Sequence, residues 1–255
     1  MPPRVRVLGV VPARLASSRF PEKALASRSG KPMVVHVLEA ALQAKSLDAV
    51  IVAADHQRIV DAVRAHGGEA ILTREDHPNG TSRLAEVAER TGAEILVNIQ
   101  GDEPEIEPEV IDAATELLLA TAWADVATIA SPFAADEDPT DPNLVKVVLG
   151  ADGRALYFSR SAIPFWRDRI LRPNQSAPAP FLRHVGLYAY RGAFLQEFVR
   201  WPISPLEETE SLEQLRILEH GRSIAVAVRQ VSTQGIDTPE QYEAFLQRFA
   251  ARTRS

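Results

Sequence analysis

A short segment near the N-terminus combines positive charge with hydroxyl groups. Arg14, Arg19 and Lys23 supply the cations, and Ser17 and Ser18 supply neutral hydrogen-bond donors. The segment follows an apolar stretch typical of a buried strand, so we expect it at the carboxyl edge of a sheet, where open α/β proteins bind ligands. Such a loop suits a triphosphate, although it lacks the glycine spacing of the P-loop and of dinucleotide-binding proteins. A solvated basic loop is the alternative interpretation.

Two carboxylates are candidate ligands for Mg2+. Asp102 follows the apolar segment Ile95–Ile99 within Gln100-Gly101-Asp102. Because strand ends meet at one edge of a parallel sheet, we expect Asp102 near the basic loop, and a carboxylate beside a triphosphate is how proteins hold Mg2+. The second candidate, Asp237, stands two residues before a proline that is typical of the first position of a helix. Asp237 or its neighbour Thr238 is therefore also a candidate helix cap.

A third set of polar side chains lies in the second half of the chain. Arg160, Arg167 and Arg183 carry guanidinium groups, which bind carboxylates in a bidentate way. Alternation along an expected strand places His184 and Tyr188 on the same face, so both side chains could approach one ligand. In isolation, a histidine and a tyrosine in such a strand are more often structural.

A polar helical face is expected slightly further along. In the segment Leu206–His220, Glu210, Glu213 and Gln214 fall on one face at helical spacing, and leucines occupy the other. Such a face offers hydrogen-bond acceptors and donors to a ligand. A polar face is usually only solvated, and that alternative stays open here.

Composition excludes several classes of protein. The chain has 255 residues, of which 45% are hydrophobic and 24% charged, with a formal net charge of -6. These values are typical of a globular protein and give no support to a nucleic-acid-binding surface. The absence of cysteine excludes disulfides and thiolate chemistry. No secretory leader and no apolar run long enough to span a membrane are recognisable, so a cytoplasmic protein is expected.

Strands and helices alternate through the first half of the chain, which predicts a mostly parallel, doubly wound sheet. The expected strands are Val5–Val11, Ala49–Ala53, Glu69–Leu72, Ile95–Ile99 and Val126–Ala130, and the expected helices are Pro32–Ala44, His56–His66, Thr81–Arg90 and Pro108–Ala120. In this arrangement the loops that follow the strands, with their polar side chains, share one edge of the sheet.

The pattern changes after a stretch rich in proline and aspartate at 132–142. Strands expected at Leu144–Leu149, Ala155–Ser159 and His184–Arg191 suit a smaller antiparallel lobe, and Pro173–Pro180 is expected to be a mobile loop. A last strand, Ser223–Arg229, is expected between the helices Leu206–His220 and Pro239–Arg252.

Taken in order, these segments resemble the CMP-Kdo synthetase (3-deoxy-manno-octulosonate cytidylyltransferase) family from about Val7 to Tyr242. The matching motifs include Pro12-Ala13-Arg14, Ala54-Asp55-His56, Arg83-Leu84-Ala85-Glu86, Asn98-Ile99-Gln100-Gly101-Asp102-Glu103-Pro104, Val145-Lys146-Val147-Val148, Tyr157-Phe158-Ser159-Arg160, Arg183-His184-Val185-Gly186, Leu212-Glu213-Gln214-Leu215-Arg216 and Asp237-Thr238-Pro239. The His184 and Glu213-Gln214 segments distinguish this family from the broader nucleotidyltransferases.

The resemblance implies a glycosyltransferase-A-like (Rossmann-like) α/β nucleotidyltransferase fold. One cytidylyltransferase domain, 1–255, would comprise a nucleotide-binding core at about 1–132 and 223–255 and a smaller sugar-binding and dimerisation lobe at about 143–205. It implies transfer of CMP from CTP to the anomeric hydroxyl of Kdo (3-deoxy-D-manno-octulosonate), for lipopolysaccharide biosynthesis. It also implies a homodimer assembled through the smaller lobe. The aromatic residues Phe165, Trp166 and Trp201 near that lobe are candidates for the interface and equally for the core.

The same resemblance assigns roles to individual residues. The implied catalytic residues are Arg14, Lys23, Asp102 and Asp237, of which the two aspartates bind Mg2+ as cofactor. Ser17 would join Arg14 and Lys23 at the CTP phosphates, and Asn79 and Gly80 would lie near the cytidine. The residues implied around Kdo, which would converge across a cleft between the lobes, are Arg83, Gln100, Arg160, Arg167, His184, Tyr188, Glu213 and Gln214.

The sequence departs from the family pattern in the nucleotide half. Asn79 stands where serine is usual, Ser82 where an acidic residue is usual, and Phe20 and Glu22 where leucine and glycine are commoner. Glu22 places a negative charge beside Lys23. Two alternatives stay open: a cytidylyltransferase for another sialic-acid-like or amino-substituted sugar acid, and a non-catalytic nucleotide-sugar-binding protein, which the presence of both aspartates disfavours.

Overall fold

The chain folds into two compact units. The computed structural model describes residues 6–17, 19–167, 181–231 and 235–253, so Ser18 and the expected Pro173–Pro180 loop lie outside the described residues. Unit 1 comprises Met1–Asp112, Ala189–Val199 and Ser232–Ser255, and unit 2 comprises Ala113–Tyr188 and Arg200–Val231. The boundaries of these units differ from the boundaries expected for the nucleotide-binding core (1–132 and 223–255) and the smaller lobe (143–205).

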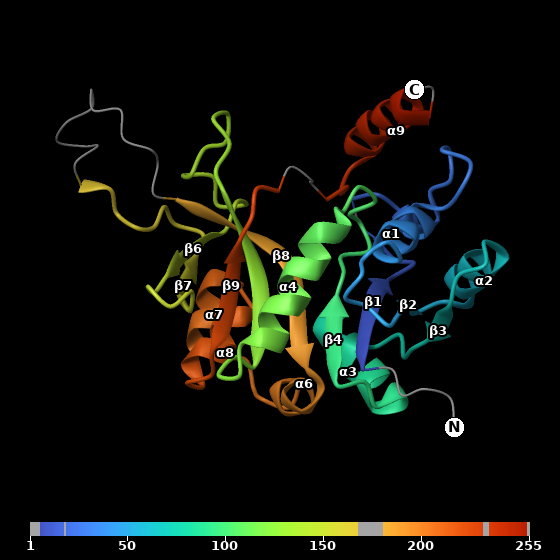
Figure 1. Cartoon of the computed structure of the whole chain (residues 1–255). Coiled ribbons are helices and arrows are strands. Elements are labelled where there is room, and N and C mark those ends of the chain that lie inside the picture. The colour runs from blue at the N-terminus through green and yellow to red at the C-terminus, as the bar shows by residue number, and fades with distance from the viewer. Residues whose placement is uncertain (1–5, 18, 168–180, 232–234, 254–255) are drawn as a thin grey trace. The chain divides into compact units, whose positions relative to one another are not determined.

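A parallel sheet forms the centre of unit 1 (Figure 1). Its strands lie in the order β3-β2-β1-β4, with bounds β1 Val7–Ala13, β2 Ala49–Ala54, β3 Ala70–Leu72 and β4 Ile95–Asn98. Val10 of β1 pairs with Ile51 of β2 on one side and with Asn98 of β4 on the other. Val10 and Val97 are fully buried, as in strands that are covered on both faces. The predicted parallel α/β architecture is confirmed.

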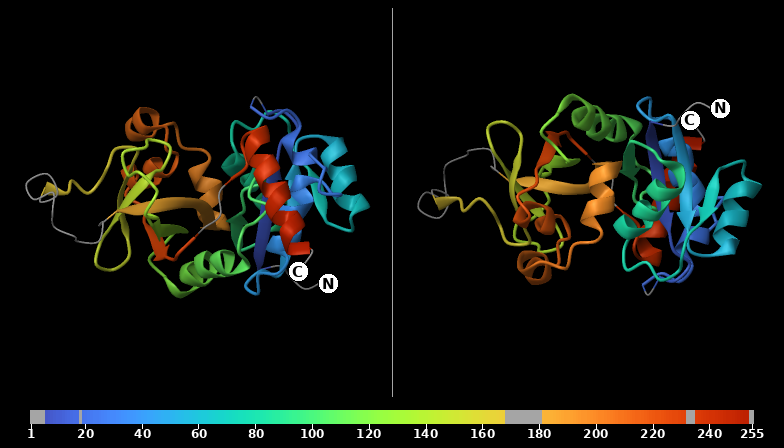
Figure 2. Two further views of the ribbon diagram at one scale, coloured as in Figure 1. Left: turned by 90° about the horizontal axis from the view of Figure 1, so that it is seen from above. Right: turned by 90° about the horizontal axis from the view of Figure 1, so that it is seen from below.

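Helices of unit 1 follow the predicted segments closely. They are α1 Met33–Ala41, α2 Gln57–Ala65, α3 Gly80–Thr91 and α9 Pro239–Thr253. The short η1 Lys23–Leu25 and α6 Gly192–Phe198 were not predicted. Helix α4 Pro108–Ala120 begins in unit 1 and ends in unit 2. The C-terminal helix α9 packs against α1, and the left view of Figure 2 draws the two helices in red and blue. Tyr242 and Phe245 of α9 are buried in one cluster with Met33 of α1, which fixes the end of the chain onto unit 1.

The ends of β1 and β4 approach each other unusually closely at a glycine. A Cβ atom at Gly101 would lie 2.4 Å from the carbonyl oxygen of Pro12, far inside van der Waals contact. Only glycine therefore fits between these two loops without moving the backbone. This contact brings the loop that carries Asp102 against the loop that carries Arg14.

Unit 2 contains both parallel and antiparallel strands. Its strands are β5 Val126–Pro132, β6 Lys146–Leu149, β7 Ala155–Ser159, β8 Leu182–Arg191 and β9 Ile224–Val228, and β8 ends in unit 1. The order β8-β5-β9 has β9 parallel to β5, while β6 is antiparallel to both β7 and β8. The antiparallel strands that were predicted for the second half are confirmed.

The predicted helix Leu206–His220 is wrong as one continuous element. It is divided into α7 Pro205–Glu210 and α8 Gln214–Glu219 because Ser211 adopts a left-handed conformation, with φ of 51°. Glu210 ends α7 and Gln214 begins α8, so Glu210, Glu213 and Gln214 do not share a face of one helix. In the described part of the chain, no helix is both long and apolar enough to cross a membrane.

Candidate active site

A cavity of about 240 Å³ lies at the carboxyl ends of β1 and β4 in unit 1. Among the residues that line it are six that the sequence analysis assigned to substrate or metal: Arg14, Ser17, Lys23, Gly80, Gln100 and Asp102. The segments that carry them follow β1, begin α3 and follow β4. The topology of a parallel sheet therefore assembles cations, a hydroxyl, an amide and a carboxylate around one space, as predicted.

Lys23 is the centre of the charged groups in this cavity. Its Nζ donates to Asp102 Oδ2 at 2.8 Å, to Asp237 Oδ1 at 2.9 Å and to the carbonyl oxygen of Ile236 at 2.8 Å. Its side chain keeps 17% of its surface exposed. Burial acts to lower the pKa of Lys23, but the charge of Asp102 and the hydrogen bonds to both carboxylates outweigh it and raise the pKa, so the ammonium stays charged.

Asp102 and Asp237 converge on one cation, although they are far apart in the sequence. The second oxygen of Asp237 contacts Arg19 Nη2 at 2.9 Å. Among the described residues no group of three or more histidine, aspartate or glutamate side chains could hold a metal ion. Two carboxylates fit Mg2+ nonetheless, because this ion is commonly held by one or two carboxylates together with substrate phosphates.

The helix cap beside Asp237 is Thr238. Thr238 Oγ1 accepts from the backbone N–H of Gln241 at 3.3 Å, and Gln241 Oε1 accepts from the N–H groups of Asp237 and Thr238 at 2.7 and 3.0 Å. This reciprocal arrangement is a capping box at the start of α9. The Asp237 carboxylate is thus not used as the cap and contacts Lys23 and Arg19 instead.

Arg14 is exposed, and its Nη2 donates to the carbonyl oxygen of His77 at 2.8 Å. His77 itself is buried, with its Nε2 2.5 Å from Glu86 Oε2. Sequence reasoning gave neither residue a role. Glu86 does belong to the quoted motif Arg83-Leu84-Ala85-Glu86. The motif alone does not show that Glu86 contacts His77, the residue whose carbonyl binds Arg14.

Glu22 directs its charge away from Lys23. It has a left-handed conformation with φ of 52°, which accounts for glycine being the commoner residue here. Both of its oxygens bind Arg58 on α2, at 2.5 and 2.8 Å, and this hydrogen bonding lowers the pKa of Glu22. Together with Ser17, Asp55 and others it lines an adjoining cavity of about 580 Å³.

The two unusual residues near the expected cytidine site interact with each other. Asn79 is the N-cap of α3, where its Oδ1 accepts from the N–H of Ser82 at 2.8 Å, and Ser82 Oγ donates to the Asn79 carbonyl oxygen at 3.0 Å. The departures from the family pattern thus form a helix cap. Gly80, at the first position of the helix, lines the cavity.

Arg83 has no exposed surface. Its Nη1 donates to Thr73 Oγ1 and to the carbonyl oxygen of Arg74, while Nε and Nη2 have no partner among the described residues. Burial lowers the pKa of this guanidinium. The structure therefore places Arg83 beneath the loop that precedes α3 and not on the surface of the cavity.

The predicted neighbours His184 and Tyr188 lie together on β8 in unit 2. Their ring centroids are 5.3 Å apart, and Phe158 meets His184 edge-on at 5.0 Å. Nε2 of His184 lies 3.1 Å from the hydroxyl of Thr128. Burial, with a smaller contribution from the charge of Arg183, lowers the pKa of His184 to about 3. His184 is thus a neutral hydrogen-bonding group near neutral pH and supplies no positive charge.

Arg160 uses its guanidinium within unit 2. Nε, Nη1 and Nη2 donate to the carbonyl oxygens of Glu210, Pro142 and Ser211 at 2.7, 2.9 and 3.2 Å. The Glu210 carboxylate in turn accepts from the Arg160 N–H. Arg160 thereby connects the end of β7 with the break between α7 and α8, and its predicted contact with a carboxylate ligand is untested.

The remaining residues predicted around the sugar have different environments. Arg167 is exposed, and Glu213 Oε1 accepts from Arg216 Nη2 at 3.1 Å. Gln214 is 6% exposed, and its Nε2 has no hydrogen-bond partner among the described residues. A buried amide without a partner is costly, so Gln214 has a donor ready for a ligand.

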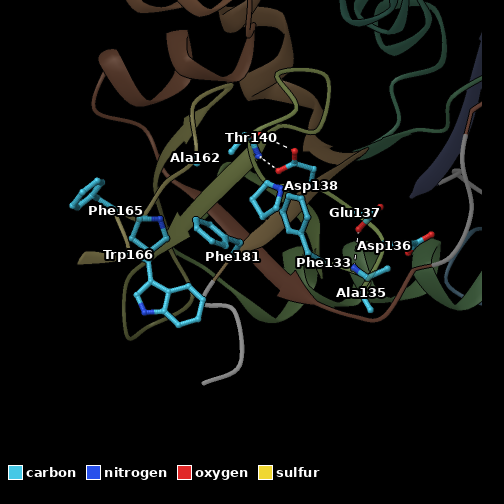
Figure 3. A pocket seen from close by; sticks show the side chains of 13 residues that line it. Phe133, Ala135, Asp136, Glu137, Asp138, Thr140, Ala162, Phe165, Trp166 and Phe181 are labelled. Atoms are coloured by element: carbon cyan, nitrogen blue, oxygen red, sulfur yellow. Dashed lines mark hydrogen bonds between the residues drawn. The ribbon is translucent and has the colours of Figure 1, made fainter. Parts of the chain in front are cut away.

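A larger cavity of about 810 Å³ lies in unit 2 and is lined mainly by aromatic and small side chains (Figure 3). Trp166 and Phe181 lie edge-to-face there, with ring centroids 6.4 Å apart, and Glu137 on its wall is paired with Arg183. Carboxylates are the only charged groups on this wall among the described residues, so it does not suit a triphosphate despite its size. We therefore assign the nucleotide site to the smaller cavity in unit 1.

Comparison with known proteins identifies relatives along nearly the whole chain. A family described as cytidylyltransferase matches residues 8–224. The 3-deoxy-manno-octulosonate cytidylyltransferases of Syntrophobacter fumaroxidans and Yersinia enterocolitica are 52% and 50% identical, over 94% and 92% of this chain and 95% of each relative. The solved structure of CMP:2-keto-3-deoxy-manno-octonic acid synthetase complexed with CTP is 41% identical, with a TM-score of 0.90 over 97% of this chain and 99% of that one.

The buried neutral His184 predicts a loss of stability in acid. Its ordinary pKa is 6.5 and its folded value about 3, so below pH 6.5 the unfolded chain takes up a proton that the native state does not. Lowering the pH from about 7 to about 5 should therefore decrease the free energy of unfolding, and His184→Gln should reduce this decrease by about 1–2 kcal/mol. Urea unfolding at both pH values measures the free energy of unfolding. The matched control is His66→Gln, since His66 is exposed. Equal pH dependence in the two variants would contradict a buried, neutral His184.

Proposed function

This chain belongs to the 3-deoxy-manno-octulosonate cytidylyltransferase family, and we propose that it transfers CMP from CTP to the anomeric 2-hydroxyl of Kdo, releasing pyrophosphate. The observation that carries the proposal is the cavity of unit 1, where Lys23 and Arg14 stand beside Asp102 and Asp237. Cations suited to phosphate oxygens lie next to carboxylates suited to a divalent metal. A site for a nucleoside triphosphate with its metal has this composition.

The nucleotide half of the reaction needs neutralisation and alignment, and no nucleophile from the protein. The sugar oxygen forms a bond to the α-phosphorus, the bond from that phosphorus to the pyrophosphate oxygen breaks, and the hydroxyl proton passes to solvent. Lys23 and Arg14 would hold phosphate oxygens, and Ser17 would donate a hydrogen bond to them. These groups stabilise the charge that develops on the leaving pyrophosphate and keep the α-phosphorus in line with the attacking oxygen.

Asp102 and Asp237 would hold Mg2+. When bound there, the ion would supply positive charge to the phosphate oxygens of CTP. The support is that both carboxylates already converge on one cation, the Lys23 ammonium, at 2.8 and 2.9 Å. If a metal took its place between the carboxylates, Lys23 would still be charged and available to the phosphates, because the ordinary pKa of a lysine lies well above neutral pH.

The sugar half of the reaction is assigned to residues of unit 2. Kdo carries one carboxylate and several hydroxyls, so its site needs donors and acceptors as well as positive charge. Gln214 supports the assignment because its buried Nε2 lacks an acceptor among the described residues. Neutral His184 and neighbouring Tyr188 would serve as hydroxyl-binding groups, which leaves the sugar carboxylate to arginines such as the exposed Arg167.

The biological setting follows from the proposed substrates. CMP-Kdo is the activated sugar for lipopolysaccharide biosynthesis, and CTP is a cytoplasmic metabolite, so we place the reaction in the cytoplasm. We further propose a homodimer assembled through unit 2. Phe165 supports it, because a phenylalanine that is 74% exposed beside an aromatic cavity is typical of an interface.

Pyrophosphate release with CTP and a set of sugar acids tests the proposed reaction. With Mg2+ present, we expect turnover with Kdo to exceed turnover with N-acetylneuraminate by at least about 100-fold, since a site built for one set of hydroxyls leaves polar groups unpaired with the other. Equal or greater turnover with another sugar acid would transfer the assignment to that substrate. Binding of CTP without turnover on any of them would indicate a non-catalytic protein.

Asp102→Asn and Asp237→Asn should each lower kcat by about 100-fold or more, because one carboxylate fewer weakens the metal site. The melting temperature should fall by no more than a few degrees and the protein should stay folded, because Thr238 and not Asp237 caps α9 and Lys23 keeps one carboxylate partner. Thr238→Ala is the matched control: it should lower the melting temperature by a few degrees, as loss of an N-cap does, and largely spare kcat. Full activity of Asp237→Asn over a range of Mg2+ concentrations would remove Asp237 from the metal site.

The dimer is tested by replacing the exposed aromatic side chain. Sedimentation velocity at micromolar concentration should show a dimer for the parent protein and a larger monomer fraction for Phe165→Asp, because a buried interface does not accommodate an unpaired charge. Ile203→Asp, which alters another exposed apolar residue of unit 2, is the comparison. A monomeric parent protein would overturn this part of the proposal.

A further inference from the structure

We propose that Glu86 is a positioning residue for the nucleotide site, acting on Arg14 through His77. The inference rests on the proposed function, in which Arg14 binds CTP phosphates. It assigns a role to the last residue of the motif Arg83-Leu84-Ala85-Glu86, which reaches no substrate itself. All the residues involved belong to unit 1.

Two consecutive contacts connect Glu86 with Arg14. Glu86 Oε2 lies 2.5 Å from His77 Nε2, and the carbonyl oxygen of His77 accepts from Arg14 Nη2 at 2.8 Å. The side chains of His77 and Glu86 are only 3% and 10% exposed. A carboxylate can only accept, so His77 Nε2 is the donor in the first contact. The first contact is therefore a buried, charge-assisted hydrogen bond, which holds its partners more firmly than a solvated one.

The ionised state of Glu86 is maintained by its neighbours. Burial acts to raise the pKa of Glu86, but the hydrogen bonds from the His77 ring and the Arg74 N–H, together with the charge of Arg90, lower it. The Arg74 N–H lies 3.1 Å from Glu86 Oε2, and Arg90 one turn later on α3 contacts Oε1. One carboxylate thus fixes both ends of the 74–77 segment.

Arg83 holds the same loop one turn earlier on α3. It donates to Thr73 Oγ1 and to the Arg74 carbonyl oxygen, and Thr73 is bound in turn to the Ala54 carbonyl at the end of β2. Residues three apart on a helix lie on one side, so Arg83 and Glu86 form a single clamp on the loop before α3. The clamp fixes the place at which the His77 carbonyl meets Arg14.

Fixing that carbonyl matters because Arg14 is exposed and its side chain is long. An unrestrained arginine samples many rotamers, and the loss of this conformational entropy when the ligand binds weakens the affinity. Docking one nitrogen on a rigid carbonyl orders the guanidinium before CTP arrives and leaves its other N–H groups for phosphate oxygens. Without the Glu86 contact, the His77 carbonyl and the docked Arg14 lose their defined position.

A double-mutant cycle tests the inference, with CTP and Mg2+ as the probe and calorimetry as the measurement. Glu86→Ala should weaken CTP binding by about three- to tenfold in the parent protein and by less than about twofold in Arg14→Ala, because a residue that acts through Arg14 has no effect once Arg14 is gone. The same loss in both backgrounds, or no loss in the parent, would overturn the inference. If Arg14→Ala alone left CTP binding unchanged, both this inference and the proposed phosphate site would fail.

Two further variants separate positioning from general stability. Arg90→Ala removes one further partner of the Glu86 carboxylate, and with it a hydrogen bond to the Leu72 carbonyl, but leaves the contacts of Glu86 with His77 and the Arg74 N–H, so CTP binding should stay within about twofold of the parent. Glu86→Gln retains an acceptor of the same shape and should recover part of the affinity that Glu86→Ala loses. If Glu86→Ala does not fold, the cycle is carried out with His77→Ala and its conservative counterpart His77→Gln. Weakening by Arg90→Ala equal to that by Glu86→Ala would overturn the inference.

Discussion

The candidate site of unit 1 is organised around one ammonium group between two carboxylates. The ammonium belongs to Lys23 in the short helix η1 that follows β1, and the carboxylates belong to Asp102 after β4 and Asp237 before α9. These three parts of the chain meet only in the folded state. Removing one carboxylate leaves a partly buried charge with less compensation, which costs more than the loss of an exposed pair. Gly101 allows the segment after β4 to touch the segment after β1. The aromatic cluster of α9 packs on α1 and so holds the segment that contains Asp237 on unit 1.

The features predictable from sequence were those set by local pattern. Apolar strands and amphipathic helices repeat with their own periods, so most elements of unit 1 are found within a few residues of their predicted bounds. The convergence of Arg14, Gln100 and Asp102 was also predictable, because it follows from the topology of any parallel sheet and needs no knowledge of side-chain contacts. The family resemblance added residues such as Asp237, for which local pattern left two interpretations open.

The features that escaped prediction depend on contacts between distant parts of the chain. Helical periodicity runs unbroken through 206–220, and nothing local signals the left-handed Ser211 whose neighbours bind Arg160 from fifty residues earlier. Glu86 supports Arg14 by way of the backbone carbonyl of His77. Every residue type has such a carbonyl, so the sequence does not indicate which one is used. Likewise, Thr238 caps α9 while the Asp237 carboxylate accepts a hydrogen bond from Lys23, a residue distant in the sequence.

The late position of Asp237 has a consequence for biosynthesis. During synthesis β1 to β4 leave the ribosome well before Asp237 and the packed face of α9, which come far later in the chain. Until then the nascent chain has Lys23 and Asp102 without the third charged group. By the proposed assignment, the metal and nucleotide site is therefore complete only once Asp237 has been synthesised, and a truncation before Asp237 removes part of the site together with Tyr242 and Phe245, which pack against Met33 of α1.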